Sequence, residues 1–142
     1  MKQNNTMALK LMDMTTERDR VESFSGGKWP FRTGLLAPQK MAEAGFFYCG
    51  SELNGWDCVR CFVCLKELGG WEPCDDPWEE HRGHSPGCLL ARLARKQALL
   101  TVYETYDVMA AHCMAIQKDL LHRRKAQLEE LHKQVENMIR AA

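Results

Sequence analysis

The residues of this 142-residue chain most able to do chemistry are its seven cysteines, three of which stand at equal steps in one stretch. The segment DCVRCFVC contains Cys58, Cys61 and Cys64, so a CxxC pair of thiols occurs in it twice. A CxxC pair supplies two ligands of a metal site or the two thiols of a redox site. The residues downstream of the segment distinguish these chemistries.

A histidine and a further cysteine follow at spacings that complete a metal site. His81 comes sixteen intervening residues after Cys64, and Cys88 comes after six more. Three thiolates and one imidazole form a closed tetrahedral set, which binds zinc structurally and leaves no position for a reacting water. We therefore expect one structural zinc ion, whose binding supplies much of the folding free energy of a small domain.

Other assignments of these residues stay open on spacing alone. Cys58 could pair with Cys61, and His84 could replace His81 or Cys88, because His81 and His84 lie three residues apart on one helical face. Redox use of the CxxC pair is disfavoured, because no βαβ pattern follows it. The remaining thiols are expected to be ordinary core or surface groups: Cys49, Cys74 and Cys113.

The elements that position these ligands lie in the first half of the chain, which contains every glycine, proline and tryptophan. Thr16 or Asp19 could cap a first helix that runs into RVESF, and APQKMAEAGF predicts a second. FFYCG, GWDCVRC and FVCLKEL predict short strands, and Asp76 caps a short helix at DPWEEH. The expected fold is α+β, with a short three-stranded antiparallel sheet and short helices followed by one long C-terminal helix.

From about Leu89 to Ala142 no residue breaks a helix, so a nearly uninterrupted helix is expected. Apolar residues repeat there every seven positions, with offsets three residues on, as in a coiled coil. The alternative is a hairpin packed back on the domain, which is disfavoured because no turn residue occurs before Asn137. We expect partner helices to cover Met114, Leu121, Leu128, Leu131, Val135 and Met138.

Charge and hydropathy restrict the partners and the compartment. The 19 basic and 19 acidic residues balance, which argues against a charge-driven grip on nucleic acid. The chain contains no apolar run of about 18 residues, so no membrane span is expected. Residues 1–16 lack the apolar core of a signal peptide, so we expect a reducing, intracellular environment in which clustered cysteines bind metal.

The order of the motifs resembles the baculoviral inhibitor-of-apoptosis repeat, or BIR, over residues 18–90. The matching stretches are FSGGKWPF, MAEAGFFYC, CFVCLKELGGWEP, DDPWEEH and HSPGC. The resemblance implies that zinc is bound by Cys61, Cys64, His81 and Cys88. It also divides the chain into an N-terminal tail (1–16), a BIR zinc domain (17–90), a linker and dimerisation segment (91–101) and a long amphipathic helix (102–142).

The chain resembles members of this family that have one repeat followed by a long helix, and this resemblance implies a role in mitosis. By resemblance, the chain is a non-enzymatic subunit of the chromosomal passenger complex, and its helix bundles with borealin and the inner centromere protein to place the Aurora B kinase. The resemblance also implies inhibition of apoptosis, and a location in nucleus and cytoplasm, with the centromere, kinetochore and spindle midzone in mitosis. The alternative is a stand-alone caspase regulator that binds peptides with an N-terminal alanine.

The resemblance further implies that the BIR domain binds a histone tail with a free N-terminus and a phosphorylated threonine at its third position. The strand LKELGG would accept the peptide as an added strand. Trp71 would wall a pocket for the first side chain, Asp75 would pair with the terminal ammonium, and Lys66 and His84 would lie near the phosphate. The expected peptide-binding residues are Lys66, Glu67, Leu68, Trp71, Asp75 and His84.

Two glycines depart from the family's pattern. Gly69 stands where a glutamate is often found, which removes one carboxylate from the amine pocket, and Gly55 stands where an acidic residue is often found. Arg20, which matches an arginine of the family's first helix, is expected to be buried and structural.

The residues do not suggest an enzyme. The cysteine and histidines after Cys88 are too few and wrongly spaced for the eight ligands of a RING module, and no phosphate loop, nucleophile elbow or acid–base dyad occurs. The apolar linker predicts a homodimer through Leu93, Leu99, Leu100 and Val102.

Overall fold

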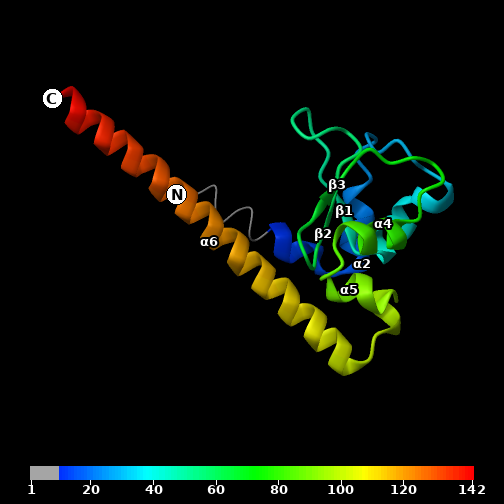
Figure 1. The fold of residues 1–142 in the computed structure, drawn as a ribbon. Coiled ribbons are helices and arrows are strands. Elements are labelled where there is room, and N and C mark those ends of the chain that lie inside the picture. The colour runs from blue at the N-terminus through cyan, green and yellow to red at the C-terminus, as the bar shows by residue number, and fades with distance from the viewer. Residues whose placement is uncertain (1–9) are drawn as a thin grey trace.

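The structure, a computed structural model, describes residues 10–142 as a small α+β unit and one long helix that projects from it (Figure 1). The expected fold class is confirmed, since three short antiparallel strands lie among short helices and a long helix follows. The elements in chain order are η1 (Asp13–Thr15), α2 (Glu17–Ser23), η2 (Gly34–Leu36), α3 (Pro38–Glu43), β1 (Phe46–Tyr48), β2 (Val59–Cys61), β3 (Glu67–Leu68), α4 (Pro77–His84), α5 (Leu89–Leu93), η3 (Gln97–Leu99) and α6 (Val102–Ala141).

The sheet has the order β1-β2-β3, and both strand pairs are antiparallel. Phe46 lies opposite Cys61, and Val59 lies opposite Leu68. Successive side chains of a strand point to opposite faces, so Val59 and Cys61 face the core while Arg60 faces the other side. Strand β3 forms an edge of the sheet, which leaves one side of it without a strand neighbour.

Short-range capping explains where the helices begin. Thr16 precedes α2, and its hydroxyl accepts a hydrogen bond from the backbone N–H of Asp19. Asp76 precedes α4, its carboxylate accepts from two backbone N–H groups of the first turn, and Pro77 follows it. Both starts agree with the capping residues that the sequence suggested.

The core contains one fully buried arginine. The Arg20 guanidinium lies 4.2 Å from the centroid of the Phe62 ring and donates to the backbone carbonyls of Ala42 and Met14. It also donates to the side-chain oxygen of Gln97. Burial lowers the pKa of Arg20 to about 10, so the group is still charged at neutral pH. Arg20 is therefore a structural residue that ties α2 to α3 and to the linker before α6.

The expectation of a nearly uninterrupted helix from Leu89 is wrong. Helix α5 ends at Leu93, and Ala94 adopts a left-handed conformation with φ of 50°. A non-glycine residue in this conformation leaves no trace in a search for glycine and proline, which is why the break was not expected. Thr101 then begins α6 with a capping box, in which its side chain and that of Glu104 each bind a backbone N–H of the other.

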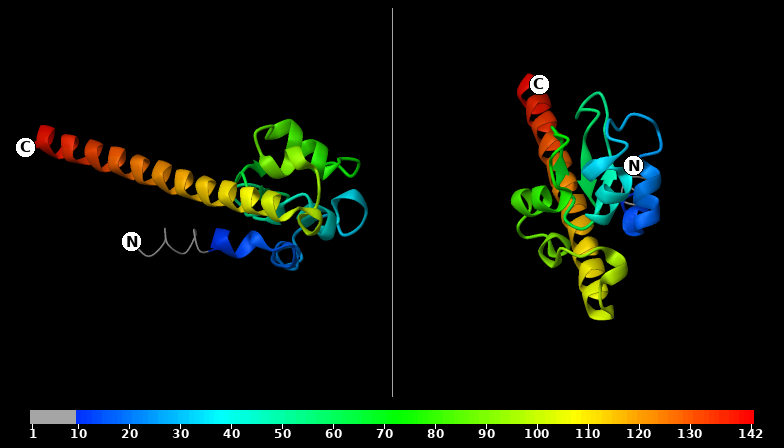
Figure 2. Two further views of the ribbon diagram at one scale, coloured as in Figure 1. Left: turned by 90° about the horizontal axis from the view of Figure 1, so that it is seen from below. Right: turned by 90° about the vertical axis from the view of Figure 1, so that its right-hand side faces the viewer.

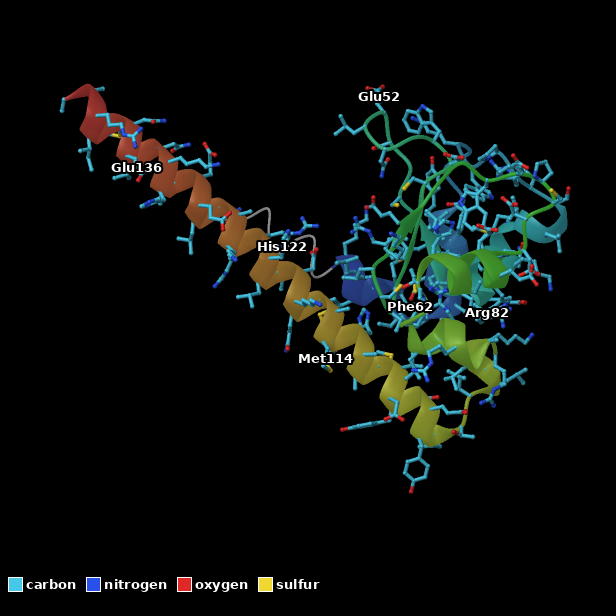
Figure 3. All side chains as sticks on the ribbon, viewed as in Figure 1. Glu52, Phe62, Arg82, Met114, His122 and Glu136 are labelled. Carbon is cyan, nitrogen blue, oxygen red and sulfur yellow. The ribbon has the colours of Figure 1, made fainter. Side chains whose placement is uncertain are left out.

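Helix α6 runs back along the domain before it leaves it (Figure 2). Val108, His112 and Ile116 are buried against the domain, at a spacing of four residues. The hairpin alternative therefore holds for the first part of the helix. From residue 124 onward every residue is exposed, and Figure 3 shows Glu136 on this projecting part and Phe62 within the domain.

Part of the segment expected as an N-terminal tail is packed on the domain. Leu11 is buried in the core cluster, and the Thr15 carbonyl accepts a hydrogen bond from the Gln97 side chain. Residues 1–9 of that tail lie outside the described residues. Among residues 10–142, no helix is both long enough and apolar enough to cross a membrane.

Candidate metal centre and peptide groove

Four of the expected ligands come together at one point. The ligand atoms of Cys61, Cys64, His81 and Cys88 all lie within 4.8 Å of one another. Cys61 ends β2 and Cys64 follows in the next turn, His81 lies in α4, and Cys88 is the residue before α5. Leu65, the residue directly after Cys64, has a positive φ of 61°. Four separate elements thus meet at this cluster, which could hold one metal ion.

The donor atoms are oriented for a single ion. The Sγ atoms of Cys61 and Cys88 are 4.0 Å apart, and the Cys64 Sγ lies 3.6 Å from the His81 Nε2. The other ring nitrogen of His81, Nδ1, is 2.9 Å from the Ala44 carbonyl oxygen, so it carries the proton and leaves Nε2 free as a ligand. Outer hydrogen bonds also hold the sulfurs.

Those outer bonds come from the backbone and from a hydroxyl. The Val63 N–H donates to the Cys61 Sγ at 3.3 Å, and the Ser85 hydroxyl donates to the Cys64 Sγ at 3.2 Å. Such donors stabilise negative charge on sulfur, which is the form that binds a metal.

Without a metal, the cluster already favours a thiolate beside an imidazolium. Hydrogen bonds from the Cys61 and Cys88 thiols hold the pKa of Cys64 far below its usual range, whereas burial raises the pKa of Cys61 well above it. Burial disfavours the charged form of His81, but the hydrogen bonds and negative charge of Cys64 and Cys88 outweigh this and raise its pKa to about 9. The metal cluster therefore favours a positive charge beside the Cys64 sulfur, which a bound metal cation would also supply.

The alternative ligands lie elsewhere. The Sγ of Cys58 is 3.5 Å from that of Cys49, and neither belongs to the four-residue cluster. His84 is exposed and its Nε2 lies 3.3 Å from a carboxylate oxygen of Glu80, one turn earlier in α4. Neither Cys58 nor His84 takes the place of a cluster member.

A groove of about 280 Å³ opens beside the edge strand β3. It contains all six residues expected to bind a peptide, which come from β3, the segments on either side of it and α4. Gly69, which the resemblance had placed at the amine pocket, also lines it, and so does Glu80, which the sequence did not suggest. The lining is completed by Lys66, Glu67, Leu68, Trp71, Asp75 and His84.

Hydrogen bonds fix the floor of this groove. Trp71 is almost buried, packs edge-on against Phe46 and donates from its indole nitrogen to the Leu68 carbonyl at 3.4 Å. One carboxylate oxygen of Asp75 accepts from the Glu72 N–H at 2.8 Å. The indole wall and the carboxylate are therefore held in place without a ligand.

Asp57 holds the backbone next to the groove in place, a role that no sequence pattern indicated. One of its carboxylate oxygens accepts from the N–H groups of Gly70 at 2.7 Å and of Trp71 at 3.1 Å. Its partners stand thirteen and fourteen residues away along the chain, so no local pattern could have linked them. Gly55, close to Asp57, has a φ of +91°, which explains a glycine there in backbone terms.

The residues expected to contact partner helices or a second copy are largely on the surface. The six seam residues of α6 have exposed fractions from 46% at Val135 to 72% at Met138. Leu99 and Val102 of the linker are exposed, while Leu93 and Leu100 are partly buried against the core cluster. His112, for which the sequence indicated no role, is buried between α6 and the domain.

Comparison with known proteins gives consistent matches for the first two thirds of the chain. A model of the protein family described as "BIR: Inhibitor of Apoptosis domain" matches residues 20–92. Baculoviral IAP repeat-containing protein 5.2-A of Xenopus laevis is 46% identical over 94 residues, which cover 66% of this chain and 58% of that protein. Baculoviral IAP repeat-containing protein 5 of Mus musculus is 48% identical over 86 residues, covering 60% and 59% respectively.

A solved structure is also similar. The crystal structure of DIAP1 BIR1 bound to a Grim peptide covers 63% of this chain and 84% of its own, at 32% identity and a TM-score of 0.47. The matches to the two curated relatives span 58% and 59% of their lengths.

Proposed function

The chain belongs to the inhibitor-of-apoptosis family defined by the BIR domain, and from this premise we propose that it is a non-enzymatic adaptor. In this proposal a zinc-stabilised domain binds the N-terminus of a peptide, and the projecting part of α6 binds partner helices. The observation that carries the proposal is the groove beside β3, where an edge strand, an indole wall and carboxylates meet.

Zinc is the metal that the four donor atoms fit best. Bonds of ~2.3 Å to sulfur and ~2.0–2.1 Å to nitrogen at tetrahedral angles separate two sulfurs by ~3.8 Å and a sulfur from a nitrogen by ~3.6 Å. The corresponding separations here are 4.0 Å between Cys61 and Cys88, and 3.6 Å between Cys64 and His81. Four protein donors complete the coordination shell, so the ion stabilises the fold and has no open position for substrate.

The groove suits an extended peptide with a free amino group. Strand β3 offers backbone groups for an added strand, and the indole of Trp71 gives the groove an apolar wall. The carboxylates of Glu67, Asp75 and Glu80 line the groove, and they favour an ammonium group over an acetylated terminus. These carboxylates would supply the negative charge that other members of the family gain from a glutamate at the position of Gly69.

We propose a histone tail phosphorylated on its third residue as the ligand. In an extended peptide the third residue stands ~7 Å from the first, at ~3.3 Å per residue. Lys66 and His84 are the two basic side chains of the groove, and they would supply donors for the phosphate. Because His84 is paired with Glu80, phosphate binding would draw the imidazole away from that carboxylate.

We further propose that the exposed seam of α6 bundles with borealin and the inner centromere protein, and so places the Aurora B kinase near the histone tail. The support is an apolar stripe that the chain itself leaves uncovered. This assignment implies a nuclear and cytoplasmic protein that gathers at the centromere, kinetochore and spindle midzone in mitosis. The exposed linker side chains, Leu99 and Val102 among them, support a homodimer when partner helices are absent.

The second candidate is inhibition of apoptosis through the same groove, by binding regulators that expose an N-terminal alanine. Membership of the inhibitor-of-apoptosis family and the indole wall that Trp71 gives the groove favour it. The two candidates differ in what they need. A passenger subunit needs both the phosphate donors and the seam, whereas a groove-only regulator needs neither.

Isothermal titration of the zinc-loaded full chain tests the groove. The ligands are a histone-tail peptide with phosphothreonine at position three, the same peptide unphosphorylated, the phosphorylated peptide with an acetylated N-terminus, and a short peptide that begins with alanine. We expect the free-amine phosphopeptide to bind most tightly. Tightest binding of the alanine peptide would favour the apoptotic role, and equal binding of the free and acetylated termini would exclude an amine pocket.

Asp75→Asn is the informative variant, because asparagine keeps an acceptor for the Glu72 N–H but loses the charge. A charge-assisted hydrogen bond contributes ~1.5–3 kcal/mol, which corresponds to about a 10- to 150-fold loss of affinity. Glu79→Gln, four residues further on in the first turn of α4, exposed and outside the groove, is the matched control. Equal affinities of the two variants would remove Asp75 from the site.

The seam is tested separately by copurification. Leu128→Asp places a charge in the exposed apolar stripe, and Gln127→Asp places it one residue away, on a different face of the helix. We expect Leu128→Asp to lose borealin and the inner centromere protein while peptide binding is unchanged. Retention of both partners by Leu128→Asp would contradict the bundle.

A further inference from the structure

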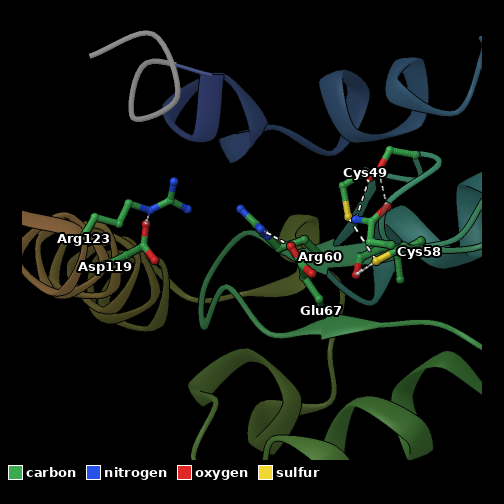
Figure 4. Close-up of polar contacts among 9 residues, drawn as sticks. Cys49, Cys58, Arg60, Glu67, Asp119 and Arg123 are labelled. Atoms are coloured by element: carbon green, nitrogen blue, oxygen red, sulfur yellow. Dashed lines mark hydrogen bonds and ion pairs between the residues drawn. The ribbon is translucent and has the colours of Figure 1, made fainter. Parts of the chain in front are cut away.

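Two cysteines outside the metal cluster face each other across neighbouring strands. Cys49 directly follows β1 and Cys58 directly precedes β2, so they form the next pair after Tyr48 and Val59. The Cys49 N–H donates to the Cys58 carbonyl at 3.1 Å, and the two Sγ atoms are 3.5 Å apart (Figure 4). Cys49 was expected to be an ordinary thiol and Cys58 a possible rival metal ligand; the structure places Cys58 outside the metal cluster and next to Cys49.

This thiol pair lies on the opposite face of the sheet from the metal cluster. Cys61 faces the core, and Cys58, three residues earlier, shares the other face with Arg60. Cys49, Arg60 and Glu67 line a cavity of about 680 Å³ on that face. Chemistry at Cys49 and Cys58 can therefore proceed without displacing a ligand of the metal.

The backbone geometry permits a bond between them. Residues that lie opposite each other in an antiparallel pair have Cα atoms ~4.5–5.5 Å apart, which lies inside the range of ~4.4–6.8 Å seen in disulfides. Closing the gap from 3.5 Å to a covalent S–S distance needs rotation of the side chains and no rearrangement of the strands. A third thiol is not needed.

We propose that Cys49 and Cys58 are a modification site that forms a reversible disulfide by exchange with low-molecular-weight disulfides such as glutathione disulfide. Cys49 is the half-buried member and lines the cavity, whereas Cys58 is buried, so Cys49 reacts first. This order makes Cys58 the resolving thiol.

The exchange balances in two steps. The Cys49 thiolate attacks one sulfur of glutathione disulfide and displaces one glutathione thiolate, which leaves a mixed disulfide. The Cys58 thiolate then attacks the Cys49 sulfur, displaces the second glutathione thiolate and forms the protein disulfide. The two protein sulfurs are oxidised, glutathione disulfide is reduced to two thiols, and the two protons pass from the protein thiols to glutathione.

The surroundings of the pair agree with a slow but stable bond. Burial raises the pKa of Cys49 and of Cys58, nearby Glu67 acts in the same direction on both, and Arg60 opposes it. A small thiolate fraction slows the exchange, and thiols that resist ionisation also make poor leaving groups, which protects the disulfide once formed. Reversible disulfides of this kind are the type found in reducing compartments.

The test uses the full zinc-loaded chain in buffers of increasing glutathione disulfide to glutathione ratio. Samples are quenched with acid, alkylated and mapped by mass spectrometry, and zinc release is followed in parallel with a chromogenic chelator. We expect Cys49 and Cys58 to lose alkylation together, with a peptide linked between them and the zinc retained. Full alkylation of both, at ratios where the exposed Cys74 and Cys113 carry glutathione, would overturn the proposal, as would linkage of either thiol to Cys61, Cys64 or Cys88.

Two variants test the order of reaction. In Cys58→Ser the reaction should stop at the mixed disulfide of Cys49 with glutathione. In Cys49→Ser, Cys58 should not react with glutathione disulfide because it is buried, so it should stay reduced and be alkylated after the quench. Cys113→Ser, an exposed thiol on α6, is the matched control and should leave the linked peptide unchanged. In Cys58→Ser, loss of Cys49 alkylation without a glutathione adduct on Cys49 would contradict the two-step route. The wild-type map decides the main point even if a variant fails to fold.

Discussion

Replacing His112 by alanine separates the docking of α6 from the folding of the domain. The His112 ring is buried between the helix and the domain, and its Nδ1 lies 2.6 Å from the Phe62 carbonyl oxygen. The variant leaves that carbonyl without a donor in a dry position, at ~1–3 kcal/mol, and it also opens a cavity. Large-to-small substitutions in cores cost ~2–5 kcal/mol. We expect a loss of ~3 kcal/mol, a large share of the ~5–15 kcal/mol by which most domains are stable.

Equilibrium urea unfolding of the zinc-loaded protein, followed by near-ultraviolet circular dichroism, measures this loss. His112→Phe keeps a ring in the space but removes the donor, so it isolates the hydrogen-bond contribution of ~1–3 kcal/mol. His122→Ala, on the exposed part of the same helix, is the control and should change stability by less than ~0.5 kcal/mol. If His112→Ala and His122→Ala unfold at the same urea concentration, the helix is not held to the domain as described.

Three further predictions concern the metal, the glycine at position 45 and the carboxylate of Asp57. Removal of zinc by a chelator should abolish the cooperative unfolding transition, because such sites contribute ~10–16 kcal/mol, and added zinc should restore it; a transition that persists would mean that the core folds unaided. Gly45→Ala should destabilise by ~1–3 kcal/mol in urea unfolding, because Gly45 has a φ of +95° and an added Cβ would lie 2.6 Å from Leu90 Cδ2. Gly83→Ala, within α4 and in open space, should be neutral or gain up to ~1 kcal/mol, and equal effects would refute the argument. Asp57→Ala should speed hydrogen exchange at the amides of Gly70 and Trp71 about tenfold or more, since each 1.4 kcal/mol is tenfold and two hydrogen bonds are lost; an unchanged rate would show that Asp57 does not brace the groove.

The metal cluster could be predicted because its information is local and chemical. The spacing of Cys61, Cys64, His81 and Cys88 limits the choice of ligands, and the resemblance to the BIR family removes the rival pairing with Cys58. Strands β1 and β2 lie within the runs expected to form strands, but the third strand is shorter than expected: β3 is Glu67–Leu68, and residues 62–64 lie in the metal-binding turn. Residue type alone did not reveal the outer hydrogen bond from Ser85 to Cys64.

The features that escaped prediction depend on tertiary contacts. Ala94 breaks the helix in a left-handed conformation, although alanine is the strongest helix former, because the linker is held at Gln97 and a new cap begins at Thr101. The docking face of α6 was hidden because the seven-residue repeat on its other side dominated the pattern. The docking face also includes His112, whose role depends on a carbonyl fifty residues away.

The long helix has a geometric consequence for whatever it carries. Residues 124–141 of α6 are all exposed, and at 1.5 Å per residue they extend ~27 Å beyond the last contact with the domain. Because the first part of the same helix is packed against the domain at Val108, His112 and Ile116, the length and direction of the projecting part are fixed relative to the domain. If a partner binds the tip of α6, as proposed, the helix would hold that partner at a fixed distance from the groove.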